Sequence, residues 1–207
     1  MEISGWGRYP KIDAEVTLPA TAVACASALK DPGLLIPRGL GRSYGDSSLA
    51  PQVLETNGMQ YFQEFDPETG VLACDAGVSL YEILNVFVPQ GWFLPVTPGT
   101  RFVTVGGAIA SDVHGKNHHI DGTFCEHVIS FDIALGNGEI VTASSMQNPD
   151  LFHATCGGMG LTGVIVSARI RLKPISSSEI LETTIKAPNL DAVLDGFEKY
   201  IGSTYSV

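Results

Sequence analysis

Three glycine-rich segments hold the residues of this chain that are best suited to chemistry. The longest, Pro98 to His119, combines glycines with two threonines, a serine and three histidines. Glycine lets a backbone approach a ligand closely and adopt a positive φ, and short hydroxyls donate hydrogen bonds. This composition is too irregular for a simple core helix, and it suits a large polar ligand such as a diphosphate.

The first segment, Pro37 to Asp46, places three glycines among two arginines and a serine. Backbone N–H groups of such a turn can form an anion nest, and an adjacent arginine can neutralise phosphate charge. A third run, Cys156 to Gly163, follows later in the chain. One segment of this kind is more often an ordinary tight connection, but three in 207 residues disfavour that interpretation.

Other nucleotide-binding and catalytic patterns have weaker support. Gly158 to Gly163 matches the Gly-x-Gly-x-x-Gly pattern, but a Rossmann site needs a strand before the glycines and a helix after them. Here a helical stretch precedes the glycines and a strand follows, which disfavours that site. The sequence has no Gly-x-x-x-x-Gly-Lys-Ser/Thr loop and no Gly-x-Ser-x-Gly elbow, and Cys125 and Cys156 lack a sequence cue to a paired base.

Three histidines at the end of the longest segment raise the question of a metal site. His114 and His118 are four residues apart, a spacing that shares one face of a helix, but Gly115 and Asn117 disfavour a helix there. We therefore predict no metal and interpret His118 and His119 as hydrogen-bonded loop residues. His114 ends the run of glycines and hydroxyls, so we expect its ring to face a cofactor.

Composition limits the function classes further. The chain has 44% hydrophobic residues and a net charge of -10, which indicates a folded globular protein and argues against a general nucleic-acid or anionic-bilayer surface. Four widely spaced cysteines without a Cys-x-x-Cys pair predict reduced, mostly buried thiols. The sequence shows no signal-peptide core and no run of about eighteen apolar residues. A cytoplasmic protein is predicted, with peripheral association at the inner membrane left open.

Periodicity, capping and turn signals predict the elements that position these segments. The capping-box pattern Ser79 to Glu82 opens one helix, Asp31-Pro32-Gly33 closes another, and Asn137-Gly138 marks an antiparallel hairpin. The predicted helices are 21–29, 79–88, 149–155 and 190–200, and the predicted strands are 34–36, 71–75, 128–135, 139–143, 163–172 and 180–185. This order predicts an α+β protein whose second half is richer in antiparallel sheet.

Together the three segments resemble the flavin-binding domain of the vanillyl-alcohol-oxidase family, also called the PCMH-type FAD domain. The stretches that carry the resemblance are 38–46, 98–119 and 154–163. Within the family the chain is most similar to the decaprenylphosphoryl-β-D-ribose 2′-oxidase group, over roughly residues 5 to 207.

The resemblance implies an FAD-binding domain of residues 1–174, made of two subdomains at about 1–90 and 91–174. Residues 175–207 would begin a substrate domain that continues beyond Val207. The β-favouring run 204–207 agrees with a chain that continues, and a natural C-terminal strand is the alternative.

FAD is expected to lie extended between the two subdomains. The resemblance places residues 37–47 and 104–107 around the pyrophosphate, and Gly99 with residues 111–114 near the ribityl chain or the isoalloxazine. The backbone of Ile165 would contact the adenosine half. The cofactor-binding residues that it implies are Pro37, Arg38, Gly39, Leu40, Gly41, Arg42, Ser43, Tyr44, Gly45, Gly99, Thr100, Thr104, Val105, Gly106, Gly107, Ser111, Asp112, Val113, His114, Gly160, Gly163 and Ile165.

The family chemistry is oxidation of a substrate C–OH group by hydride transfer to flavin N5, after which the electrons pass to a quinone, a dye or oxygen. By the same resemblance, Tyr44, His114 and Lys116 line the reactive face of the flavin and act as catalytic residues. In several covalent relatives a histidine in a Gly-x-Gly-His-Ser loop bonds to the flavin, whereas this chain has Arg42 there. Arginine cannot form that bond, so a non-covalent FAD is predicted.

The resemblance leaves more than one function open. A small-molecule substrate is expected, with a lipid-linked pentose first and a free sugar, aldonolactone or alditol next. The cysteine and lysine that similar proteins place in the substrate domain would lie beyond Val207, so little turnover is expected from residues 1–207. The alternatives are a non-catalytic FAD-binding module and a catalytically inactive relative that binds no flavin.

Overall fold

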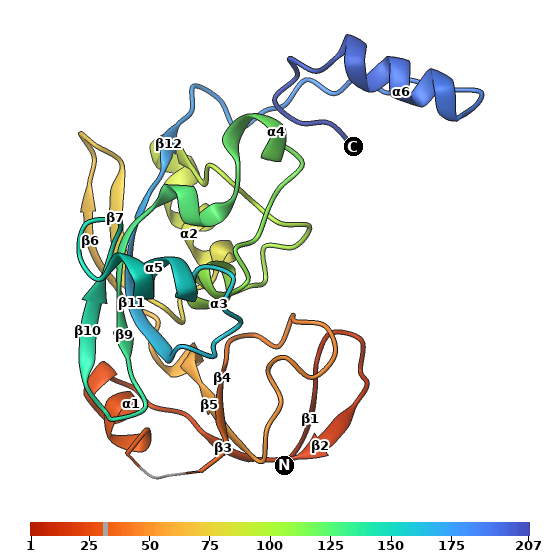
Figure 1. Cartoon of the computed structure of the whole chain (residues 1–207). Helices are drawn as coiled ribbons and strands as arrows, with labels where there is room; N and C mark the ends of the chain where they lie inside the picture. Colours follow the sequence, from red (N-terminus) through yellow and green to blue (C-terminus); the bar gives the residue numbers. More distant parts are fainter. Residues whose placement is uncertain (31–32) are drawn as a thin grey trace.

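Two sheets organise the protein in the computed structural model, which describes residues 1–30 and 33–207 (Figure 1). The smaller sheet is parallel, in the order β3 (Glu15–Thr17), β5 (Gln52–Glu55) and β4 (Leu35–Arg38). The larger sheet is antiparallel, in the order β10 (Ile140–Ala143), β9 (Val128–Ala134), β11 (Val164–Arg171), β7 (Val71–Asp75) and β6 (Phe62–Asp66). The α+β class predicted from the sequence is confirmed.

Short helices and small pairs of strands surround the two sheets. The helices are α1 (Ala22–Ala28), α2 (Leu80–Phe87), α3 (Val105–Ala110), α4 (His118–Asp121), α5 (Pro149–Thr155) and α6 (Leu190–Lys199), with single 3₁₀ turns η1 (Thr56–Gly58), η2 (Val88–Gln90) and η3 (Phe124–His127). The remaining strands are β1 (Glu2–Ser4), which pairs with β2 (Lys11–Asp13), and β8 (Trp92–Phe93), which pairs with β12 (Lys173–Pro174).

The main core lies on one face of the larger sheet. Phe131 and Ile170 come from its strands, Leu80 from α2 and Ile109 from α3, and all four are almost completely buried. Burial of each such side chain contributes about 1.5–3 kcal/mol. This core fixes α3, and with it the middle of the longest glycine-rich segment, against β11.

The larger sheet combines strands from both halves of the chain. Strands β6 and β7 pair with each other, and β7 pairs with β11. The change from one sheet to the other therefore falls between Glu55 and Phe62. Pairing between strands that are distant in sequence decides this grouping, and local periodicity carries no information on it.

Local signals locate most of the predicted elements correctly. The hairpin of β9 and β10 forms around Asn137-Gly138, with Ile140 opposite Ala134. Helices and strands appear at the other predicted ranges, with ends within a few residues, except for residues 180–185. The prediction of a strand there is wrong: Ile180 and Leu181 are exposed, and residues 180–185 pair with no strand in the part of the chain that the structure describes. Residues 31–32 of the predicted helix stop lie outside the described residues.

The C-terminal segment makes few contacts with the rest of the molecule. Helix α6 extends away from both sheets and has no buried residue (Figure 1). The end of the chain returns to the body, where the Ser206 amide donates to the Lys116 carbonyl at 3.0 Å. In the part of the chain that the structure describes, no helix is both long and apolar enough to cross a membrane.

We expect Ser79→Ala to lower the melting temperature by about 2–4 °C, the equivalent of about 1 kcal/mol. Ser79 caps α2: its hydroxyl accepts from the Glu82 amide at 3.2 Å, and the Glu82 carboxylate accepts from the Ser79 amide at 2.8 Å. The substitution removes one half of this capping box. Differential scanning calorimetry should show no comparable change for Ser176→Ala at an exposed serine; equal melting temperatures for Ser79→Ala and wild type would contradict the capping role.

Candidate FAD-binding site

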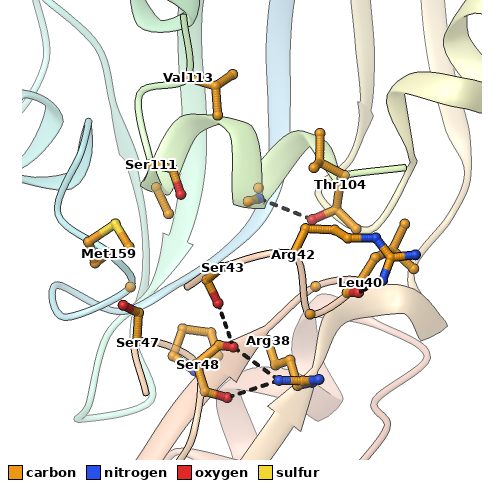
Figure 2. A pocket seen from close by; sticks show the side chains of 18 of the residues that line it. Arg38, Leu40, Arg42, Ser43, Ser47, Ser48, Thr104, Ser111, Val113 and Met159 are labelled. Atoms are coloured by element: carbon orange, nitrogen blue, oxygen red, sulfur yellow. Dashed lines mark hydrogen bonds between the residues drawn. The ribbon is translucent and has the colours of Figure 1, made fainter. Parts of the chain in front are cut away.

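The three glycine-rich segments meet at one cavity of about 620 Å³ (Figure 2). Its volume is in the range of small-molecule and cofactor sites. The predicted site residues that line it are Pro37, Arg38, Gly39, Leu40, Gly41, Arg42, Ser43, Tyr44, Gly99, Thr100, Thr104, Gly106, Gly107, Ser111, Val113, Gly160, Gly163 and Ile165. Those outside the lining are Gly45, Val105, Asp112, His114 and Lys116.

Close backbone contacts hold the segments together. A side chain at Gly39 would collide with the Thr104 hydroxyl, so the first segment packs directly on the N-terminus of α3. A side chain at Gly160, where φ is +80°, would lie 2.7 Å from Pro37. The Met159 amide donates to the carbonyl of Ala110 at 2.8 Å. These glycines therefore allow the walls of the cavity to approach one another.

The first segment presents backbone amides to the cavity. Within residues 1–30 and 33–207, the amides from Leu40 to Tyr44 donate no hydrogen bond to other protein groups. Gly41 and Gly45 have φ values of +64° and +58°, in the left-handed region that glycine favours. Consecutive free amides around such residues form a concave anion site. This loop, residues 40–44, is called the nest below.

The amides of α3 are already used inside the protein. Val105 donates to the Val78 carbonyl and Gly106 to the Ala76 carbonyl, both at 2.8 Å. Gly107 donates to the Thr104 hydroxyl at 3.0 Å (Figure 2). In the structure these three amides are therefore engaged by protein groups, and the free backbone amides at the cavity lie in the nest.

Two arginines of the first segment have different surroundings. Arg38 donates to the Ser4 carbonyl at 2.7 Å and to the Ser48 hydroxyl at 3.0 Å, and its Nε lies 3.6 Å from the Glu55 carboxylate. Its side chain is only 11% exposed, and burial lowers the pKa of its guanidinium while Glu55 opposes that shift. Arg38 thus connects the first segment to Ser4, Ser48 and Glu55. Because its guanidinium already makes these contacts, it is not free to bind a phosphate.

Arg42 is the exposed arginine of the pair. Its guanidinium donates to the Leu40 carbonyl at 3.2 Å and lies 5.1 Å from the centre of the Trp6 ring. Both side chains line the cavity. Arg42 is therefore the guanidinium available to an anionic ligand at the nest.

The three histidines are not among the residues that line the cavity, although His114 directly follows the lining residue Val113. His114 is exposed, and its ring centre is 5.5 Å from that of His118. His118 and His119 approach the carbonyls of Gly115 and Ser203 at 3.1 Å, so the predicted hydrogen-bonded role is confirmed. Both belong to α4 and not to a loop, because the helix begins directly after Asn117. The structure shows no group of three or more His, Cys, Asp or Glu side chains arranged to hold a metal ion, among the residues it describes.

The cysteines are free thiols, as predicted. Burial raises the pKa values of Cys25 and Cys74 to about 12. The fold also brings Cys125 and Cys156 together, which their spacing in sequence does not indicate. The proximity of the two thiols raises the pKa of Cys125 and lowers that of Cys156, and the Cys125 thiol donates to the Ile109 carbonyl at 3.4 Å.

The cavity is also lined by residues that were not among the predicted site residues. Those within the glycine-rich stretches already described are Ser47, Pro98, Val103, Ala110, Thr155 and Met159. Those outside these stretches are Trp6, Ser48 and Thr56, which reach the site through tertiary packing. A position between two glycines, Gly5 and Gly7, is the one local signal for Trp6.

Comparison with known proteins identifies the class of domain that this cavity defines. Residues 16–144 match the family model described as FAD binding domain. The chain therefore belongs to this FAD-binding family, and FAD is the cofactor of the domain. The cavity agrees with this cofactor, because the nest suits a diphosphate and the surrounding glycines and apolar side chains leave room for flat rings.

Several relatives are oxidoreductases. The chain is 38% identical over 201 residues to decaprenylphosphoryl-β-D-ribose oxidase of Mycolicibacterium smegmatis. This alignment covers 93% of this chain and 44% of that protein. It is 32% identical to xylooligosaccharide oxidase of Thermothelomyces thermophilus, with 79% of this chain and 34% of that protein covered. Cytokinin dehydrogenase 6 of Oryza sativa subsp. japonica is 29% identical over 80% of this chain and 33% of its own length. The chain thus spans less than half the length of these relatives.

Proposed function

We propose that this chain is the FAD-binding domain of an oxidoreductase that oxidises a C–OH group of a sugar-like substrate. The observation that carries the proposal is the nest of free amides at a cavity where three glycine-rich segments converge. Two of the relatives are named for sugar substrates, decaprenylphosphoryl-β-D-ribose and xylooligosaccharide. A polyprenyl-phospho-pentose is the first candidate substrate, and a free sugar is the second.

The nest and Arg42 would hold the two phosphates of FAD. Arg38 would maintain the conformation of the nest through its hydrogen bonds to Ser4 and Ser48. Ser111 and Val113, which line the cavity beyond α3, would contact the flavin half. FAD, when bound, supplies a two-electron acceptor for hydride. The surrounding residues would bind it and orient it.

Tyr44, His114 and Lys116 remain the proposed catalytic residues. Tyr44 lines the cavity and its side chain is exposed, so it can reach a substrate at the opening. His114 and Lys116 follow the cavity residue Val113 closely and are also exposed. We propose that an FAD-binding domain of residues 1–174 is followed from residue 175 by the start of a substrate domain, which would place the substrate over these three side chains. Within that domain, the family resemblance supports two subdomains at about 1–90 and 91–174.

Dye reduction distinguishes an enzyme domain from a simple binding module. Residues 1–207, loaded with FAD, are expected to show little or no substrate-dependent reduction of a dye with sugar, alditol or polyprenyl-phospho-sugar substrates. A longer natural chain that contains the same residues is expected to turn over. Turnover by residues 1–207 at the rate of the longer chain would contradict the proposed need for a substrate domain.

We expect the flavin to be released by acid. The position that carries a flavin-bonded histidine in several covalent relatives is Arg42 in this chain, and a guanidinium does not form that bond. After reconstitution with FAD and acid precipitation, the absorbance of the flavin should remain in the supernatant. Yellow colour in the washed pellet would contradict non-covalent binding.

A further inference from the structure

The N-terminal segment of the chain lies outside the part that matches the family model, which begins at residue 16. In the structure this segment, residues 1–13, folds as the pair of strands β1 and β2 beside the smaller sheet (Figure 1). It packs against the nest at several points. A side chain at Gly5 would lie 2.7 Å from the Ser43 carbonyl, and the Ser4 carbonyl accepts from Arg38.

Trp6 makes two contacts with the nest. Its backbone amide donates to the Ser43 carbonyl at 2.8 Å, which fixes the orientation of the peptide between Ser43 and Tyr44. Because a trans peptide directs its carbonyl and its N–H to opposite sides, the Tyr44 amide is turned away from the N-terminal segment. The Trp6 ring then stacks with the Arg42 guanidinium at 5.1 Å.

The stacking on Trp6 restricts the conformation of the Arg42 side chain, which makes few other contacts with the protein. The one protein hydrogen bond that the Arg42 guanidinium donates, among the described residues, goes to Leu40 two positions away. Arginine loses considerable side-chain entropy when a ligand orders it, and a ring that already orders the guanidinium reduces that cost. Trp6 is half exposed and lines the cavity, so a ligand at the nest would lie next to this pair.

We propose that Trp6 is a positioning residue of the phosphate-binding loop, which holds the Arg42 guanidinium in place for the diphosphate of the cofactor. The N-terminal segment then contributes to nucleotide binding, although it lies outside the residues that match the family model. This inference rests on the proposed FAD site at the nest.

The test is a double-mutant cycle with Trp6→Ala, Arg42→Ala and the combined variant, with Trp6→Phe as the conservative variant. Dissociation constants for FAD and for ADP are measured by isothermal titration calorimetry, because ADP presents the diphosphate without the flavin. Trp6→Ala is expected to weaken both ligands by about fivefold, and Trp6→Phe should stay within about twofold of wild type. In the Arg42→Ala background, Trp6→Ala should have little further effect.

The other outcomes would contradict the role of Trp6, the proposed function, or both. Wild-type affinity in Trp6→Ala, or an equal loss with and without Arg42, would overturn the positioning role, because a purely structural contribution does not depend on Arg42. Binding of ADP without FAD would overturn the proposed function, and the cycle measured with ADP would still test Trp6. If wild type binds neither ligand, both proposals are wrong.

Discussion

Gly41→Ala is expected to weaken FAD binding by about tenfold or more, an effect of about 1.4 kcal/mol. Gly41 has a φ of +64°, where a residue with a side chain costs about 1–2 kcal/mol more than glycine. Its new Cβ would also collide with the Arg38 guanidinium that supports the loop. The nest would have to change shape, and its amides would no longer converge on the phosphates.

Gly45→Ala is the matched control for this prediction. Gly45 has a similar φ of +58°, but a Cβ there meets no atom within 4 Å and the residue does not line the cavity. It therefore carries the same backbone strain without displacing Arg38. Isothermal titration calorimetry with FAD should show a clear loss for Gly41→Ala and a smaller one for Gly45→Ala. Equal affinities for the two variants would argue against phosphate binding at the nest.

Arg38→Ala is expected to lower the free energy of unfolding by about 3 kcal/mol, or the melting temperature by about 6–12 °C. The substitution removes the hydrogen bonds to Ser4 and Ser48 and leaves the Glu55 carboxylate without its cation. Arg38→Lys should recover only part of the loss, because an ammonium lacks the planar fork that bonds several acceptors.

Arg42→Ala provides the contrast within the same motif. Arg42 is exposed and donates one hydrogen bond, so its loss should change the melting temperature of the unliganded protein by no more than about 2 °C. It should instead weaken FAD and ADP binding. Calorimetric scans and titrations of the two variants would separate the roles, and a large loss of stability in Arg42→Ala would contradict this assignment.

Local chemistry in the sequence predicts much of this fold. The capping box at Ser79 and the hairpin at Asn137-Gly138 depend on neighbours within a few residues, so their patterns are visible in the chain itself. The glycine-rich segments are visible for the same reason. Their convergence on one cavity agrees with the family resemblance that the three segments carry together.

Tertiary contacts decide the features that the sequence did not predict. Arg38 and Arg42 occur in one motif, and contacts with Ser4, Ser48 and Glu55 make Arg38 the structural one. The first-turn amides of α3 are occupied because Ala76 and Val78, about thirty residues earlier, lie beside them. Residues 180–185 have the composition of a strand but find no partner.

The most direct test of the central claim is a calorimetric titration of FAD into flavin-free residues 1–207, repeated with Gly41→Ala. The account predicts one saturable site per wild-type chain, with an affinity that falls by about tenfold or more in the variant. Absence of saturable binding by the wild-type chain would contradict the FAD site. The same affinity in both proteins would show that FAD binds away from the nest.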